Sequence, residues 1–160
     1  MKPELSRVKE IAIDSGFRRV PVYEELYLDM LTPIMAMKKL RAYSNHVYLL
    51  ESASQDKTWG RYSFLGYKPS MEITCQKGHL REKMIHDDGT EKKKKKEVTH
   101  PGDELRKIIQ EYKSAVIKEL PYFTGGLVGY FSYDYIRYAE PKLELSDDGD
   151  FKDMDLMLFN

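Results

Sequence analysis

The chain has 160 residues, of which 41% are apolar and 32% charged, a composition typical of one globular domain with its own core. Its 26 basic and 26 acidic residues cancel, so it lacks the positive surplus that nucleic acid as the main partner would require. The one cysteine, Cys75, excludes an internal disulfide and indicates a reducing compartment. We expect a buried thiol with no nucleophilic role. No apolar stretch is long enough to span a membrane and no leader opens the chain, so we expect a cytoplasmic, unprocessed protein.

Three segments have the apolar periodicity of amphipathic helices: residues 3–15, 29–43 and 103–120. The first ends at Gly16, a residue that readily adopts a left-handed C-cap. In the second, Thr32 can cap free backbone amides and Pro33 suits the first helical position. The third is the clearest, with Val116 among the residues of its apolar face and Pro121 as its stop.

Extended segments are predicted at residues 18–28, 47–50, 61–66, 70–76, 80–86, from 125 onward and at 156–159. Residues 47–50 are almost wholly apolar, so we expect both faces of that strand to be covered. Asp87-Asp88-Gly89 is a strong hairpin signal, and residues 147–150 form another turn. Because tight turns separate groups of strands between the helices, the sequence predicts an α+β fold with antiparallel pairing.

The five adjacent lysines from Lys92 to Lys96 form the only low-complexity patch of the sequence. An anionic surface or nucleic acid is one interpretation of such a run. Glu91 and Glu97 flank it, however, and lysines discourage the pairing of exposed strand edges. A solvated loop or edge strand is therefore the favoured interpretation.

Neither a metal site nor a phosphate-binding loop is indicated by the sequence. The histidines at 46, 79, 86 and 100 lack ligand spacing, and the aspartates at 147–150 lack the distal glutamate of a calcium loop. Gly125, Gly126 and Gly129 fit neither the P-loop nor the dinucleotide fingerprint. From the residues alone, the glycine-rich segment is best explained as a central strand packed against another sheet.

A weaker functional signal follows the strand at residues 47–50. Glu51 and Ser52 could bind an ammonium group, and Arg61 could complement a carboxylate, which are the charges that a free amino acid requires. On the residues alone, an exposed strand end with a loop-capping serine is the simpler explanation. The sequence shows no geometry that would decide between the two.

Three segments in order resemble one known family. They are residues 20–33, beginning Val20-Pro21-Val22-Tyr23; Leu49-Leu50-Glu51-Ser52 followed by residues 60–66; and the glycine-tyrosine string at 125–138, with Glu140 after it. Together they span nearly the whole chain, and their ordered set is similar to the amino-terminal domain of component I of anthranilate synthase. The 160 residues are therefore identified as that one domain, and the carboxy-terminal chorismate-binding catalytic domain is absent from them.

The resemblance implies a specific fold and activity. The family's fold is α+β, with antiparallel sheets packed orthogonally and flanked by helices. The family enzyme converts chorismate and ammonia to anthranilate and pyruvate in tryptophan biosynthesis. It uses Mg²⁺, and a glutamine amidotransferase subunit (component II) supplies the ammonia. Catalytic and metal motifs lie in the other domain, so we expect this chain alone to be inactive, with no catalytic or metal residues of its own.

The resemblance also reverses the interpretation of Glu51 and Ser52. In the family, this domain contributes to the tryptophan feedback-inhibition site, which implies inhibitor-binding roles for Glu51, Ser52, Arg61, Tyr62 and Ser63. Two alternatives stay open: the same domain of aminodeoxychorismate synthase component I, in the folate pathway, and a stand-alone ligand-binding module. The chain stops at Asn160 within an apolar run, so we expect it to be an excised fragment.

Overall fold

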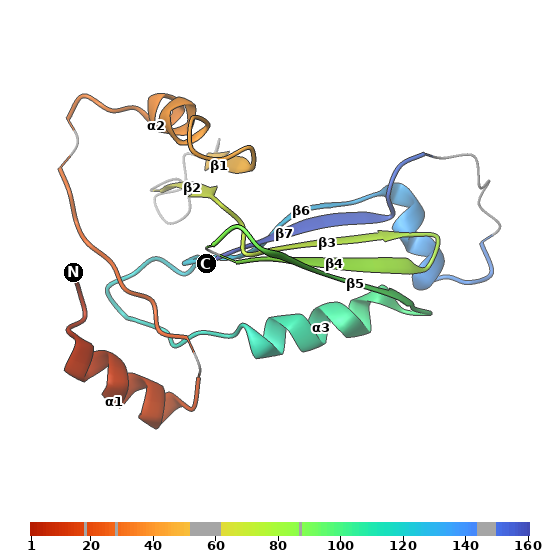
Figure 1. Ribbon diagram of the computed structural model, residues 1–160, viewed down its shortest axis with the longest axis horizontal. Coiled ribbons are helices and arrows are strands. Elements are labelled where there is room, and N and C mark those ends of the chain that lie inside the picture. Colours follow the sequence, from red (N-terminus) through yellow and green to blue (C-terminus); the bar gives the residue numbers. More distant parts are fainter. Residues whose placement is uncertain (18, 28, 52–61, 87, 144–149) are drawn as a thin grey trace.

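Figure 1 shows the protein as a computed structural model, which describes residues 1–160 except 18, 28, 52–61, 87 and 144–149. Its elements in chain order are α1 (Leu5–Ser15), α2 (Pro33–Leu40), β1 (Val47–Glu51), β2 (Ser63–Tyr67), β3 (Met71–Gln76), β4 (His79–Ile85), β5 (Glu91–Glu97), α3 (Pro101–Glu111), β6 (Gly126–Phe131), the 3₁₀ helix η1 (Tyr133–Tyr138) and β7 (Met154–Phe159). The strands of the described residues form two antiparallel sheets, one of two strands and one of five. The predicted α+β class is confirmed.

The five-stranded sheet has the order β5-β4-β3-β7-β6, so the last strand of the chain lies between β3 and β6. Ile73 and Gly129 both pair with Leu156, which fixes β7 in register with its two neighbours. A Cβ at Gly129 would collide with the carbonyl of Asp155 on β7. The glycine therefore permits the close approach of two backbones.

The core lies between this sheet and α3, which runs along one face of it (Figure 1). Alternate residues of β3 are buried, as strand geometry requires when one face is covered. They join alternate residues of β7 and two residues of α3, Leu105 and Ile108. Each aliphatic side chain buried in this way contributes about 1.5–3 kcal/mol. The core residues buried on the sheet and on α3 are Met71, Ile73, Cys75, Leu80, Leu105, Ile108, Met154, Leu156 and Leu158.

The helix expected over residues 103–120 ends at Glu111, so its second half was predicted wrongly. Ala115 instead donates its backbone N–H to the carbonyl of Arg19 at 3.1 Å, and Ser114 forms an isolated parallel bridge with Arg19. This long-range pairing outcompetes a helix through Val116, a β-branched residue of low helical propensity. Val116 is 91% exposed, and Ala115 is buried in its place.

The other helix predictions differ from the structure mainly at their ends. The helix expected over 29–43 is only Pro33–Leu40, but Thr32 caps it as predicted and accepts a hydrogen bond from the Met35 N–H at 3.2 Å. The helix expected over 3–15 is Leu5–Ser15, and Gly16 ends it in the left-handed region with φ 67°. Within the described residues 19–27 of the predicted extended segment 18–28, the pairing consists of isolated bridges at Arg19 and Tyr23.

Both edges of the five-stranded sheet bear on sequence predictions. The lysine run forms β5, an exposed edge strand, which confirms the favoured interpretation of Lys92 to Lys96. The glycine-rich segment forms β6, which is the opposite edge within the described residues and not a central strand as expected. Burial of both faces of residues 47–50 was also wrong, because none of these residues is fully buried and Leu50 is 45% exposed.

A buried carboxylate ties the β3–β4 turn to the start of β7. Asp153 is 2% exposed, and its Oδ2 accepts hydrogen bonds from the Tyr138 hydroxyl and the Lys77 backbone N–H, each at 2.6 Å. The Tyr138 oxygen in turn accepts the Gly78 N–H at 2.8 Å. Burial and the neighbouring Asp153 raise the pKa of Tyr138 well above its usual range, because both favour the neutral phenol.

Cys75 lies beside this group, with its Sγ 3.6 Å from the Tyr138 hydroxyl. The thiol is fully buried, and burial raises its pKa above the ordinary value. A raised pKa leaves little thiolate, the reactive form. The expectation of a buried cysteine is confirmed.

Candidate functional site

The β1–β2 hairpin carries the described part of the predicted site. Its antiparallel register runs from Val47 opposite Tyr67 to Glu51 opposite Ser63. The Ser63 hydroxyl donates a long hydrogen bond of 3.4 Å to Glu51 Oε1. Both side chains are exposed, so the structure brings together a carboxylate and a hydroxyl at the end of the hairpin where β1 ends and β2 begins.

Two of the predicted residues, Ser52 and Arg61, lie outside the described residues, and their roles stay predictions. Tyr62 is described, and its ring lies 6.0 Å from that of Phe64. Because side chains alternate along an extended chain, Tyr62 and Phe64 share the hairpin face opposite Glu51 and Ser63. Of the five predicted residues, the three that are described are therefore divided between the two faces of the hairpin: Glu51 and Ser63 lie on one face and Tyr62 on the other.

The Phe64 face of the hairpin borders an apolar cavity of about 850 Å³. The rings of Phe64 and Phe123 meet edge to face at 5.4 Å, a favoured geometry for aromatic pairs. Ile108 of α3, Leu127 of β6 and Leu158 of β7 also line the cavity. Residues 112–118, where the helix was expected to continue, also line it. The cavity could accommodate an aromatic or aliphatic group.

The hairpin rests on the five-stranded sheet through a second aromatic contact. Tyr48 meets Phe159 of β7 edge to face, with ring centroids 4.7 Å apart. Gly66 lies opposite Tyr48, and a Cβ at that position would overlap the tyrosine ring. Burial raises the pKa of Tyr48 above its usual value. The glycine in Ser63–Tyr67 therefore leaves room for the ring that fixes the hairpin on the sheet.

Sequence reasoning missed the cavity-lining residues Phe64 and Phe123 as well as the Tyr48 contact. The alternation in residues 62–64 was a usable signal, since it separates Tyr62 and Phe64 from Ser63. No local pattern indicates that Phe123, sixty residues later, comes to the same place. Long-range placement of this kind depends on the sheet topology.

Neither a metal cluster nor a membrane-spanning helix occurs in the part of the chain that the structure describes. It contains no group of three or more histidine, cysteine, aspartate or glutamate side chains placed to hold a metal ion. The described residues therefore do not fit the Mg²⁺ that the resemblance implies for the parent enzyme. No helix among the described residues has the length and apolar character needed to cross a bilayer.

Comparison with known proteins places the chain in context. No protein-family model matches it. The chain is 36% identical over 132 residues to anthranilate synthase component 1 of Acinetobacter calcoaceticus, covering 81% of this chain and 26% of that protein. It is 39% identical over 135 residues to the component 1 of Pseudomonas putida, covering 84% and 26%. A probable anthranilate synthase component 1 of Schizosaccharomyces pombe is 34% identical over 143 residues, covering 89% and 25%.

These matches and the fold define an α+β domain related to one part of a larger synthase component. More particularly, the chain is related to anthranilate synthase component 1. The three sequence motifs had predicted a relation to the amino-terminal domain of that protein. The chain spans about a quarter of the length of the curated relatives it matches.

Proposed function

We propose that the chain is the amino-terminal, effector-binding domain of an anthranilate synthase component I. The observation that carries the proposal is the run of relatives bearing this name, at 34–39% identity over more than four-fifths of the chain. The full-length enzyme would convert chorismate and ammonia to anthranilate and pyruvate, with the ammonia delivered from glutamine by an amidotransferase subunit. The proposed compartment is the cytoplasm.

In this proposal, the chemistry and the Mg²⁺ belong to a carboxy-terminal chorismate-binding domain, and this chain alone is inactive. The described part of the chain offers an exposed carboxylate–hydroxyl pair, Glu51 and Ser63, which suits the binding of a small polar effector. Its thiol, Cys75, is buried with a raised pKa.

The proposed effector is tryptophan, bound at the end of the β1–β2 hairpin where β1 ends and β2 begins. Glu51 would accept the ammonium group, with Ser63 and Ser52 orienting the carboxylate of Glu51. Arg61 would pair with the effector's carboxylate. Tyr62 lies on the other hairpin face, so it would border the site from the side, and the indole slot would be completed by protein beyond this chain.

The activity is tested with the full-length protein, chorismate, ammonium and Mg²⁺, by following anthranilate through its fluorescence. We expect anthranilate and pyruvate in equal amounts from the full-length enzyme, and none from the 160 residues alone. Accumulation of aminodeoxychorismate without pyruvate would assign the protein to the folate branch instead. No chorismate consumption by the full-length protein would leave only a ligand-binding module and overturn the proposal.

Effector binding is tested by calorimetry with tryptophan on the same full-length protein. Glu51→Gln and Ser52→Ala should each weaken binding by about 1–3 kcal/mol, because the first removes the charged partner of the ammonium group and the second leaves that partner without its orienting hydroxyl. Glu10→Gln is the matched control, since Glu10 is an exposed carboxylate on α1, outside the hairpin. Equal affinities for wild type, Glu51→Gln and the control would remove Glu51 from the site.

A further inference from the structure

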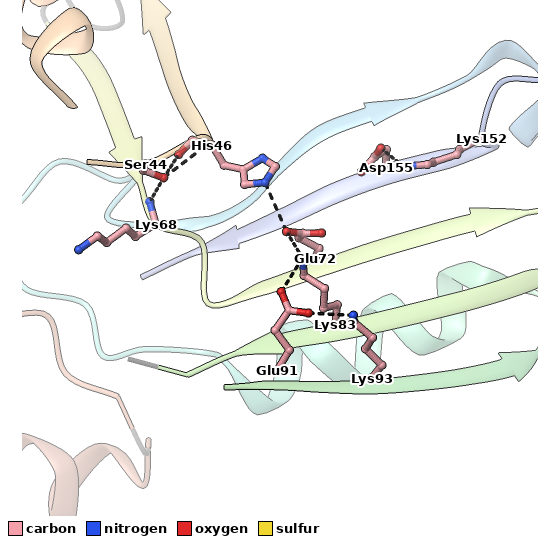
Figure 2. A network of polar contacts seen from close by, with 9 residues as sticks. All are labelled: Ser44, His46, Lys68, Glu72, Lys83, Glu91, Lys93, Lys152 and Asp155. Atoms are coloured by element: carbon pink, nitrogen blue, oxygen red, sulfur yellow. Dashed lines mark hydrogen bonds and ion pairs between the residues drawn. The ribbon is translucent and has the colours of Figure 1, made fainter. Parts of the chain in front are cut away.

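The base of the β1–β2 hairpin is fastened by one serine. The Ser44 hydroxyl donates to the carbonyl of His46 at 2.8 Å and accepts the His46 N–H at 3.2 Å. The same oxygen accepts the Lys68 N–H at 3.1 Å, from the segment just after β2. Ser44 therefore ties together the entry and the exit of the hairpin (Figure 2). His46, whose backbone is held by the hydrogen bonds of Ser44, immediately precedes β1.

From this base the His46 ring reaches across to the five-stranded sheet. Its Nε2 lies 3.4 Å from Glu72 Oε1 on β3, as Figure 2 shows. Glu72 alternates with the buried Met71 and Ile73, so it lies on the sheet face opposite α3. His46 thus provides a polar link between the hairpin and the central sheet, beside the apolar contact of Tyr48.

Glu72 Oε1 is buried and lies 3.0 Å from Lys83 Nζ. No described donor gives it an aligned hydrogen bond, so its compensation is an ion pair. A buried carboxylate oxygen whose negative charge is balanced only by an ion pair is stabilised by any further positive charge nearby. His46 is the hairpin side chain placed to supply that charge, through its contact with Glu72.

The row of charges next to Glu72 is otherwise balanced. Lys83 also lies 3.1 Å from Glu91, which in turn lies 2.8 Å from Lys93. The Glu72 and Glu91 contacts raise the pKa of Lys83 above its ordinary value, so Lys83 stays charged. The charges of these two carboxylates and two ammonium groups cancel. The net charge of the cluster therefore depends on the charge of His46.

The other charged groups nearby have partners of their own. Met157 is the β7 residue that pairs with Glu72, so β7 presents no charge at that position. Asp155 of β7 lies further along the sheet and pairs with Lys152 at 2.6 Å (Figure 2). On the hairpin side, the Lys68 ammonium lies 6.0 Å from the centre of the Tyr67 ring.

We propose that His46 is a positioning residue, which by pairing with Glu72 holds the effector-binding hairpin against the central sheet and makes effector affinity depend on pH. The proposal rests on the effector site of the preceding section. Histidine changes its charge between pH 5 and 8. With His46 protonated, the hairpin is held as in this structure. With His46 neutral, it retains the aromatic contact but loses the ionic one.

The link acts on the effector site because both lie on one short strand. His46 precedes β1 at one end, and Glu51 stands at the other end, opposite Ser63. Rotation of the hairpin about its base would move Glu51 relative to the sheet and to whatever completes the site. We expect effector affinity two- to five-fold higher at pH 6 than at pH 8, the range of a half-exposed ion pair.

The link itself is measured without effector, by hydrogen exchange with mass spectrometry on the full-length protein. Peptides covering β1 should exchange two- to five-fold faster at pH 6 in His46→Gln or Glu72→Gln than in wild type. The double variant should be no faster than either single variant, because both remove one interaction. Additive acceleration, or no acceleration in either single variant, would overturn the proposal.

The effect on the site is then measured by tryptophan calorimetry at pH 6 and pH 8. His46→Gln should bind weakly at both pH values, and His46→Arg should bind tightly at both, because its charge is fixed. A merely structural histidine would not be rescued by a cation. His79→Gln is the matched control, since His79 lies 3.8 Å from Glu97 on the same sheet and outside the hairpin. It should keep the wild-type pH dependence.

The outcomes separate this proposal from the proposed function. Tryptophan binding that is the same at both pH values in wild type would overturn the role of His46 and leave the effector site standing. Absence of any tryptophan binding would overturn the effector site and with it the regulatory role of the link. Tight binding of His46→Gln at pH 6 would also contradict the proposal.

Discussion

The buried group around Asp153 gives the sharpest test of how this fold is held together. In Tyr138→Phe the ring, which packs on the core, is retained and only the hydroxyl is lost. That hydroxyl donates to Asp153 at 2.6 Å and accepts the Gly78 N–H at 2.8 Å. The substitution therefore removes one charge-assisted hydrogen bond and leaves one turn amide without its acceptor.

The size of the loss follows from these two contacts. A hydrogen bond to a charged group contributes about 1.5–3 kcal/mol, and a buried donor left unsatisfied costs about 1–3 kcal/mol. Allowing for overlap between the two, we expect Tyr138→Phe to lower the free energy of unfolding by about 2–4 kcal/mol. This is a large share of the roughly 5–15 kcal/mol of an ordinary domain. Urea unfolding followed by circular dichroism should show the midpoint falling by about 1–2 M.

The same hydroxyl predicts a dependence on pH. The pKa of Tyr138 is raised in the folded state, so its contribution is fully present below the unfolded value near 10 and is lost as pH rises toward the folded value. The difference in unfolding free energy between wild type and Tyr138→Phe should therefore shrink above pH 10. Asp153→Asn, which keeps a carbonyl acceptor for both donors, should be the milder change. A loss below about 0.5 kcal/mol in Tyr138→Phe would refute this reasoning.

Three further predictions concern single residues. Gly129→Ala should lower the free energy of unfolding by at least about 3 kcal/mol in urea melts, because its Cβ would collide with the Asp155 carbonyl; a near-neutral change would contradict the close approach of β6 and β7. Cys75 should react with a thiol reagent only at the rate of unfolding, because it is fully buried with a raised pKa; fast labelling in native buffer would count against its burial. Ser63→Ala should weaken tryptophan binding less than Glu51→Gln does in calorimetry, because the long bond from Ser63 only orients the charged group; the reverse order would make Ser63 the primary contact.

Local signals predicted the parts of the fold that depend on neighbours in sequence. Thr32 caps its helix and Gly16 ends another, because each acts through backbone groups within a few residues. Gly89, with φ 81°, forms the β4–β5 turn, as the Asp-Gly signal indicated, although Asp87 itself lies outside the described residues. These features required no knowledge of the rest of the molecule.

Two of the predictions that failed depend on distant partners. The helix beyond Glu111 lost to pairing with Arg19, more than ninety residues earlier in the chain. The position of β6 at the edge follows from β7 being inserted next to β3. No residue pattern within either segment reports such a neighbour.

The candidate site divides in the same way. The neighbourhood of Glu51 and Ser63 could be predicted from motif order, and the structure places the two side chains in contact. The roles of Ser52 and Arg61 stay predictions. The separation of Tyr62 from Glu51 needed only the alternation of an extended chain, but that alternation has meaning only once the register of the hairpin is known.

The two edge strands of the five-stranded sheet differ in chemistry. An additional strand would therefore pair more readily with one edge than with the other. On β5, a row of ammonium groups repels any approaching backbone. On β6, the sequence from Gly126 to Phe131 carries no charged side chain. Any additional strand, whether contributed by the same polypeptide or by another molecule, therefore meets a barrier at the lysine margin and none at the glycine margin.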